Sequence, residues 1–579
     1  MKYSELELYF KTRFEELLNK RTPDSYRVRN HNVLSILEEF SELIEGWQKR
    51  RIQNYETVVL CAEECSKLID DDLWVDYSFY DKNLFIADIE EYIKVLPDSK
   101  DKRESIYEIS SKLKYICRKC IGNNSCVYAE RLFSYLIGEI NKPGDMDDDG
   151  CYIKEMQLFE KAIVYLCNEL LRLGHSKNHL YMKATKLLRG NLTIGNLKSQ
   201  LLNQRNTLYE VVYKFQSNSY IDECKNEYGF INNIDAIKDK LTNQKGNVSY
   251  SSFLNNSGRS LFKVFEVEAL DTYAAIKKAK DSMAILLDTL YLDNDVQAGR
   301  FDSKVLVLSK ASTGGFYSEL RALDYQLDGI YKSDPDMSKR LKLQVDDILG
   351  SNFVKDDAKE RLKSALRHLR LANDSNDMEL RFVNYWIALE FIFSSPISRE
   401  NTFTRIKKHL VNVLCYSYVA RNVKYLDSLL YKDGALKTGE SLEEMDDAEW
   451  GKLINSVTDK MAQYRLCVMK SHLHSKEGIE DYITVHRTNI EWHISRIYRM
   501  RNELIHEAAL KQDIEGVTSN LRFYLIFLLN QLVNYFHAAD MSVSINDFFH
   551  DYENKLNVIL TGKNRQSVLK AEYEMSLFC

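Results

Sequence analysis

An arginine, an amide and a histidine stand at short spacing near the C-terminal end of the chain. They are Arg501, Asn502 and His506, in the run SRIYRMRNELIHEAA. Attack of a ribose 2′-OH on its neighbouring phosphodiester needs a group that moves a proton near neutral pH, which histidine provides. It also needs a fixed positive charge on the crowded phosphate, which a planar guanidinium supplies. The three residues therefore indicate cleavage of RNA without a metal.

Helical spacing places Arg501 within an apolar stripe. At about 100° per residue, it shares a face with Ile497 and Leu504. Arg501 and His506 lie about 140° apart around the axis, so one helix does not easily bring both to one phosphate. Two copies of the chain facing each other across a twofold axis could do so. The alternative from spacing alone is that Arg501 pairs with a buried carboxylate and His506 is a surface residue.

The positive charge that could contact RNA is local. The chain has 579 residues and a formal net charge of −6, which excludes a protein that coats nucleic acid over its whole surface. Arg487, Arg496 and Arg499 lie close to Arg501 with Glu491 as the only acid among them. We expect this segment to bind RNA phosphates, and a solvated helix face is the alternative.

Composition indicates an ordinary cytoplasmic protein. Hydrophobic residues make up 45% and charged residues 28%, and only five prolines interrupt the chain, which favours long helices. No apolar run reaches the roughly 18 residues of a membrane span, and the first residues are charged and amphipathic. A chain of this length needs about three or four domains or subdomains.

Two places in the chain have residue types that can bind a metal ion, but we expect a metal at neither. Seven of the eleven cysteines fall between Cys61 and Cys167, including Cys117 and Cys120, but a second C-x2-C pair is missing. We expect reduced, buried thiols there, with zinc as the alternative. His175 and His179 have the spacing of metal ligands, yet their surroundings are typical of a polar break between helices. No cofactor is expected.

The patterns along the chain predict a mainly α, multi-domain protein. Residues 1–250 contain successive amphipathic helices, and 251–354 form a small β-α-β segment. In that segment, strand patterns at Leu261–Leu270 and Lys304–Ser309 flank a predicted helix. Residues 355–579 return to helical periodicity and predict a bundle.

Two separated stretches resemble one family. Arg381–Phe393, which reads RFVNYWIALEFIF, and Arg501–His506, which reads RNELIH, are similar to the ApeA-like branch of the HEPN domains. The resemblance covers about residues 355–540. It implies an all-α, usually dimeric, metal-independent endoribonuclease that leaves a 2′,3′-cyclic phosphate. The two signatures would meet at the dimer interface.

The resemblance also implies roles for individual residues. Arg501 would stabilise the phosphorane, His506 would act as general acid or base, and Asn502 would orient the phosphate or His506. Glu390 falls on an otherwise apolar helix, where a carboxylate must be paired or protonated. It would hold Arg501 in position, and an ion pair with another arginine, such as Arg405, is the alternative.

Prokaryotic members of this family commonly act as toxins or abortive-infection effectors that cut RNA, often tRNA, when a phage is sensed. The resemblance therefore implies an anti-phage effector that acts as a homodimer, with a phage-derived trigger or regulatory partner at the N-terminal region. Two alternatives remain open. One is a non-catalytic bundle that binds RNA or nucleotide through the basic segment. The other is an antitoxin-like scaffold that associates with a separately encoded protein.

Overall fold

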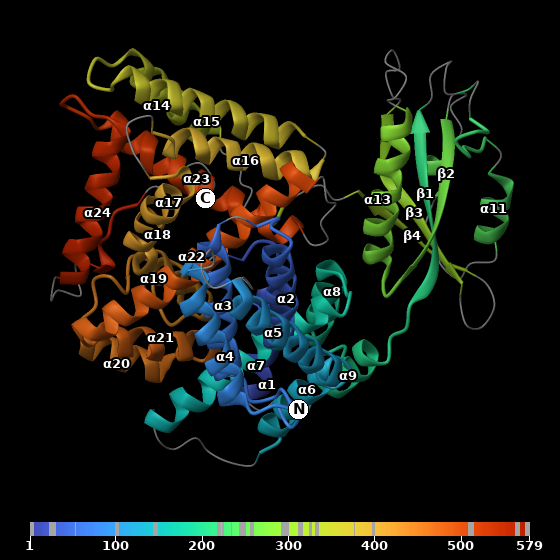
Figure 1. Cartoon of the computed structure of the whole chain (residues 1–579), viewed down its shortest axis with the longest axis horizontal. Helices are drawn as coiled ribbons and strands as arrows, with labels where there is room; N and C mark the ends of the chain where they lie inside the picture. Colours follow the sequence, from blue (N-terminus) through green and yellow to red (C-terminus); the bar gives the residue numbers. More distant parts are fainter. Residues whose placement is uncertain are drawn as a thin grey trace. The chain divides into compact units, whose positions relative to one another are not determined.

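The structure is a computed structural model of the whole chain (Figure 1). It describes residues 5–22, 31–52, 54–98, 103–142, 149–216, 222, 225–232, 234–242, 250–254, 260–290, 300–310, 316–323, 327–329, 335–375, 377–395, 400–507, 514–561 and 568–573. The described chain is mainly α-helical, as predicted, and divides into two compact units. Unit 1 comprises Met1–Glu169 and Leu327–Cys579, and unit 2 comprises Leu170–Gln326.

The N-terminal part of unit 1 is a set of amphipathic helices, and the C-terminal end of the last one enters unit 2. They are α1 (Glu5–Leu18), α2 (Val33–Gln48), α3 (Tyr55–Asp71), α4 (Lys82–Val95), α5 (Arg103–Asn124), α6 (Tyr128–Ile140) and α7 (Asp149–Arg172). Helix α2 begins at a capping box, in which the Asn32 side chain accepts from the Ser35 backbone amide and the Ser35 hydroxyl accepts from the Asn32 amide. This motif fixes the start of a helix that contributes to the site described below.

The C-terminal part of unit 1 is also helical. Its helices are α14 (Pro335–Gly350), α15 (Asp356–Asp374), α16 (Met378–Phe393), α17 (Thr402–Arg405), α18 (Val411–Tyr416), α19 (Tyr418–Asp433), α20 (Asp447–Ser456), α21 (Lys460–Leu473), α22 (Lys476–Glu507), α23 (Ile514–His537) and α24 (Ile545–Thr561). They enclose one large hydrophobic core, in which Trp386 and Trp450 are almost fully buried. Helix α23 is apolar on nearly all sides because it lies inside this core.

Unit 2 contains a four-stranded antiparallel sheet. Its elements are α8 (Lys177–Leu188), α9 (Ile194–Leu202), β1 (Thr207–Gln216), α11 (Asp235–Thr242), α12 (Ser251–Leu254), β2 (Ser260–Ala269), α13 (Thr272–Leu290), β3 (Arg300–Lys310) and β4 (Phe316–Ala322). The strand order is β2-β1-β3-β4, and Val211 of β1 lies opposite Phe265 and Val307. Helix α13 covers one face, and α11 and α12 lie on the other (Figure 1).

The boundaries expected from sequence differ from this arrangement. The strands at 261–270 and 304–309 are present, but β1 lies inside residues 1–250, where no strand was predicted at this position. The sheet is antiparallel rather than a minimal β-α-β unit, because β1 inserts between β2 and β3. Residues 1–169 share a compact unit with the C-terminal helices, so the predicted divisions at 250 and 354 do not mark where the units separate. No described helix has the length and apolar character that crossing a membrane requires.

Candidate functional site

Helices α16 and α22 bring Glu390 and Arg501 together. Arg501 Nη2 lies 3.3 Å from Glu390 Oε1, and both side chains are partly exposed, at 22% and 30%. Glu390 therefore pairs with Arg501 and not with Arg405. The Arg405 guanidinium instead donates to the Phe393 carbonyl at 2.8 Å and to Asn546 at 3.2 Å.

An indole donor fixes the Glu390 carboxylate. Trp386, one turn earlier on α16, donates from Nε1 to Glu390 Oε1 at 2.7 Å. Trp386 is almost fully buried, and its ring lies 5.9 Å from that of Tyr498 on α22, which stacks on Phe403. These aromatic side chains pack between α16 and α22. They hold Trp386 in place, and Trp386 in turn fixes the Glu390 carboxylate that pairs with Arg501.

The Arg501 guanidinium has one further protein acceptor and retains unused donor capacity. Its Nη1 donates to Asn502 Oδ1 at 3.0 Å. Its Nε is buried without a hydrogen-bond partner. Three preceding residues of the predicted stripe, Ile490, Ile494 and Ile497, are buried, whereas Ile505, one turn beyond Arg501, is 44% exposed. Arg501 therefore lies where the apolar stripe leaves the core, and its charge is paired yet reachable from solvent.

His506 belongs to the last turn of α22, but its side chain lies outside the described residues. Its distance from Arg501, and the expected contact between His506 and Asn502, are therefore not part of the described geometry. Asn502 is partly buried and accepts from Arg501.

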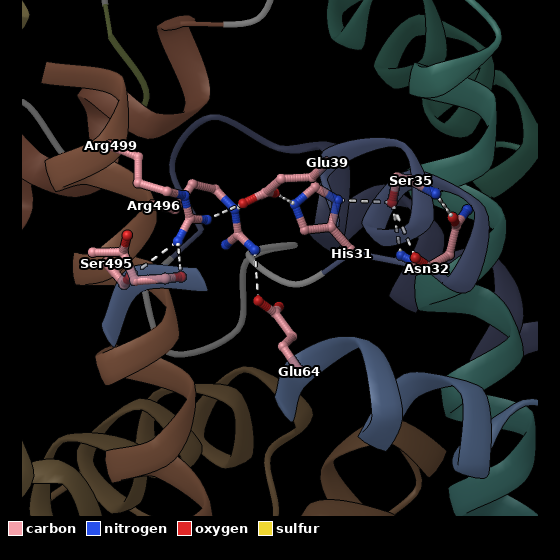
Figure 2. Close-up of polar contacts among 9 residues, drawn as sticks. His31, Asn32, Ser35, Glu39, Glu64, Ser495, Arg496 and Arg499 are labelled. Atoms are coloured by element: carbon pink, nitrogen blue, oxygen red, sulfur yellow. Dashed lines mark hydrogen bonds and ion pairs between the residues drawn. The ribbon is translucent and has the colours of Figure 1, made fainter. Parts of the chain in front are cut away.

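Two further arginines of α22 pair with acidic residues of the N-terminal helices. We name Glu39, Glu64, Arg496, Arg499 and His31 the Glu39 network (Figure 2). Arg496 donates from Nε to Glu39 Oε2 at 2.8 Å and from Nη2 to Glu64 Oε2 at 2.6 Å. Arg499 donates to Glu39 Oε1, and His31 Nε2 lies 2.6 Å from Glu39 Oε2. Glu39 lies on α2 and Glu64 on α3, so the network joins both helices to α22.

The network corrects the prediction that Arg496 and Arg499 bind RNA. Their side chains are only 11% and 7% exposed and face carboxylates inside the protein. Arg499 also donates to the Thr57 carbonyl and the Ser495 hydroxyl, each at 2.9 Å. These donors are not free for phosphate, because the carboxylates and carbonyl of the protein already occupy them. Arg487 is half-buried and donates to Asn412 Oδ1 at 3.3 Å, and RNA binding by Arg487 stays a prediction.

The Glu39 carboxylate is ionised despite its burial. Burial alone would raise its pKa, but the guanidinium groups of Arg496 and Arg499 outweigh burial, and the pKa of Glu39 is held well below its usual range. Burial alone would lower the pKa of Arg496, but the carboxylates of Glu39 and Glu64 outweigh burial and raise it. Separating Glu39 from the two guanidinium groups would leave an unpaired charge inside the protein, which is costly.

The described residues contain no group of three or more His, Cys, Asp or Glu side chains placed to hold a metal ion. Cys117 and Cys120 are buried free thiols, as predicted, and burial raises the pKa of Cys120 to about 12. His175 and His179 stack with ring centroids 6.1 Å apart. Burial lowers the pKa of His175, which contacts the Leu201 carbonyl through Nε2 at 3.1 Å.

Sequence reasoning missed the acidic half of the Glu39 network. Glu39 and Glu64 lie in amphipathic helices that contain several other acids, so composition does not distinguish them. Their helical position would have given a signal, because each shares a face with buried residues, such as Leu43 for Glu39 and Cys61 for Glu64. Comparisons with protein-family models, with curated proteins and with solved structures find no match to this chain.

One buried histidine outside the site makes the fold sensitive to acid. His409 is 6% exposed and stacks on Phe549 with ring centroids 4.6 Å apart. Burial, aided by Arg405 and Lys408, lowers the pKa of His409 to about 4. An unfolded chain takes up this proton near pH 6.5 and the folded chain does so only near pH 4. We therefore expect the free energy of unfolding to fall by up to about 3 kcal/mol across this window.

The measurement is urea unfolding at several pH values between 7 and 4, compared between wild type and His409→Phe, which keeps an aromatic ring. The variant should lose less stability than wild type as the pH falls. Equal losses in both proteins would show that His409 does not contribute.

Proposed function

We propose that this chain is a cytoplasmic, metal-independent endoribonuclease that cleaves RNA by attack of a 2′-OH and leaves a 2′,3′-cyclic phosphate. The observation that carries the proposal is the pair between Arg501 and Glu390. It joins the two sequence signatures that are similar to those of HEPN domains, although they are distant in the chain. A helix chosen for packing alone would have aliphatic residues at both positions, because these carry no desolvation penalty.

In this proposal, Arg501 stabilises the negative charge that develops on the phosphate. Glu390 and Asn502 accept from its two terminal nitrogens and so fix the plane of the guanidinium. His506, at the end of the same helix, moves the proton from the 2′-OH or to the leaving oxygen. Since these roles need no Lewis acid, the reaction is expected to proceed without divalent cations.

Exposed apolar side chains lie on α16 and α22, the two helices that carry this pair. Leu380, Ile387 and Phe391 lie within about 40° of one another on α16. Leu380 is 57% exposed and Phe391 is 41% exposed, and Ile505 on α22 is 44% exposed. We propose that two copies pack through this surface, which would bring two Arg501 residues and two His506 residues to one cleft. In such a dimer, Arg501 of one copy and His506 of the other could contact the same phosphate, although the two residues lie about 140° apart on a single helix.

Placing a charge on this surface should separate the copies. Phe391→Asp is expected to convert a dimer into a monomer and to lower RNA cleavage at least about tenfold, because a buried carboxylate costs far more than the 1.4 kcal/mol that a tenfold change represents. Size-exclusion chromatography with light scattering gives the mass, and a cleavage assay gives the rate. The control is Val558→Asp on α24, which is 62% exposed and lies outside this surface. A monomeric wild type with full activity would contradict the dimer.

The biological role follows from the chemistry. A nuclease that cuts cellular RNA harms its own host, so we propose a toxin or abortive-infection effector that acts when a phage is sensed, with tRNA as the first substrate to test. Unit 2 is the part of the chain most suited to receive a phage-derived trigger, since it is a separate compact unit inserted between the two parts of unit 1. The rival, a non-catalytic RNA-binding bundle, loses support because Arg496 and Arg499 are engaged inside the protein.

The proposed function is tested with the purified chain and total RNA in the presence of EDTA. We expect cleavage to continue, and we expect the products to acquire 2′,3′-cyclic phosphate ends, which T4 polynucleotide kinase without ATP removes. Loss of cleavage on adding EDTA, or products with 5′-phosphate and 3′-hydroxyl ends, would contradict the mechanism. RNA binding without cleavage on prolonged incubation would favour the non-catalytic alternative.

A further inference from the structure

The Glu39 network contacts α22 immediately before the candidate site. Arg496 and Arg499 precede Arg501 by five and two residues, which are about 7.5 Å and 3 Å along the helix axis. All three lie on one uninterrupted helix, so they move together. Whatever fixes Arg496 and Arg499 also fixes the rotation and axial position of Arg501.

The contacts constrain the helix from two sides. Arg496 reaches Glu39 on α2 and Glu64 on α3, and Arg499 also reaches Glu39 (Figure 2). Arg499 donates in addition to the Thr57 carbonyl on α3. Charge-assisted bonds from planar guanidinium groups are directional, unlike apolar packing. A small rotation of α22 would break several of them at once.

Stability alone does not account for this arrangement. Buried ion pairs are often no better for stability than apolar residues of similar volume. Here the arrangement is also imperfect, because Glu64 Oε1 is buried without a hydrogen-bond partner. The directional bonds of such a set of charges favour one rotation and one axial position of the helix.

We propose that Glu39 and Glu64 are positioning residues for Arg501, so that α2 and α3 are an integral part of the catalytic unit. This inference rests on the proposed function for its effect on cleavage. Its structural part, that the two carboxylates hold the end of α22, stands independently. It assigns to the N-terminal helices a role that differs from the sensing or restraint expected from sequence.

The test compares hydrogen exchange and cleavage in Glu39→Gln and Glu64→Gln with two controls. Glu42→Gln changes an exposed carboxylate of α2, and Glu16→Gln changes a buried carboxylate that pairs with Arg13 and Arg465 outside the network. Mass spectrometry follows amide exchange in the peptide that covers residues 495–507. Steady-state kinetics separates kcat from KM.

We expect Glu39→Gln and Glu64→Gln to speed exchange in this peptide at least about tenfold, beyond any change in the rest of unit 1. They should lower kcat more than they change KM, because a misplaced guanidinium harms the transition state more than binding. Glu42→Gln should resemble wild type, and Glu16→Gln should lower stability without selective exchange in this peptide.

Two outcomes would overturn the inference. One is unchanged exchange in residues 495–507 of both Glu39→Gln and Glu64→Gln. The other is an increase that Glu16→Gln reproduces, because the network would then only add stability. If wild type cleaves no RNA, the proposed function fails, while the exchange measurement still decides whether the two carboxylates hold α22.

Discussion

Arg501→Ala is expected to lower the rate of RNA cleavage by about 10²–10³-fold, the loss that follows when one group that stabilises transition-state charge is removed. Because Glu390 is 30% exposed, water can hydrate its carboxylate when Arg501 is absent, and the fold should survive. Arg501→Lys keeps the charge but presents no planar pair of donors, so it should restore little of the activity. Single-turnover cleavage of a defined RNA measures both variants.

The matched control is Arg370→Ala on α15, where an exposed arginine pairs with Asp374 at 3.1 Å outside the site. It should cleave at the wild-type rate. Thermal unfolding of each variant shows whether any loss reflects unfolding. Cleavage by folded Arg501→Ala at the wild-type rate would remove the residue from the mechanism.

The second large effect is on stability and concerns Glu16 on α1. Its carboxylate lies 2.5 Å from Arg13 Nη1 and 2.5 Å from Arg465 Nη2 on α21, and it accepts from the Tyr425 hydroxyl at 2.7 Å. Glu16→Gln leaves two buried guanidinium groups with less negative charge. Loss of one partner from a buried pair costs about 3–5 kcal/mol, so we expect the free energy of unfolding to fall by about this amount. Urea unfolding measures it.

The same carboxylate predicts a dependence on pH. Burial acts to raise the pKa of Glu16, but Arg465 and Arg13 outweigh burial and lower the pKa to about 2. Its contribution is therefore fully present above about pH 4.5 and is lost as the pH falls toward 2. Wild type should lose this stability in acid, and Glu16→Gln should lose less. Equal slopes for the two proteins below pH 4.5 would contradict the assignment.

Most of the helices can be predicted from the sequence, because the spacing of apolar residues along a helix repeats every 3.6 residues and is visible in a short segment. The helical periodicity within residues 355–579 predicts a bundle, and the helices from α15 to α24 lie in this range. Periodicity alone does not show where one helix of the bundle ends and the next begins, as between α20 and α21. The break occurs because the Asp459 side chain caps a new helix by accepting from the amides of Met461 and Ala462.

Contacts between residues that are distant in the chain were harder to predict from the sequence. The alternation in β1 is visible in its sequence, TLYEVVYKFQ, yet only its partners β2 and β3 show why it is a strand. The pair of Glu390 with Arg501 was predictable because both interrupt apolar helices and so need a partner. The partners of Arg496 and Arg499 could not be predicted, because Glu39 and Glu64 lie more than four hundred residues earlier in the chain.

The most direct test of the account is inducible expression of wild type and His506→Ala, followed by sequencing of RNA 5′ ends. The account predicts discrete cleavage sites and arrested growth with wild type, and neither with His506→Ala produced at the same level. Identical cleavage sites in both strains would contradict it, because RNA would then be cut without the group proposed to move the proton.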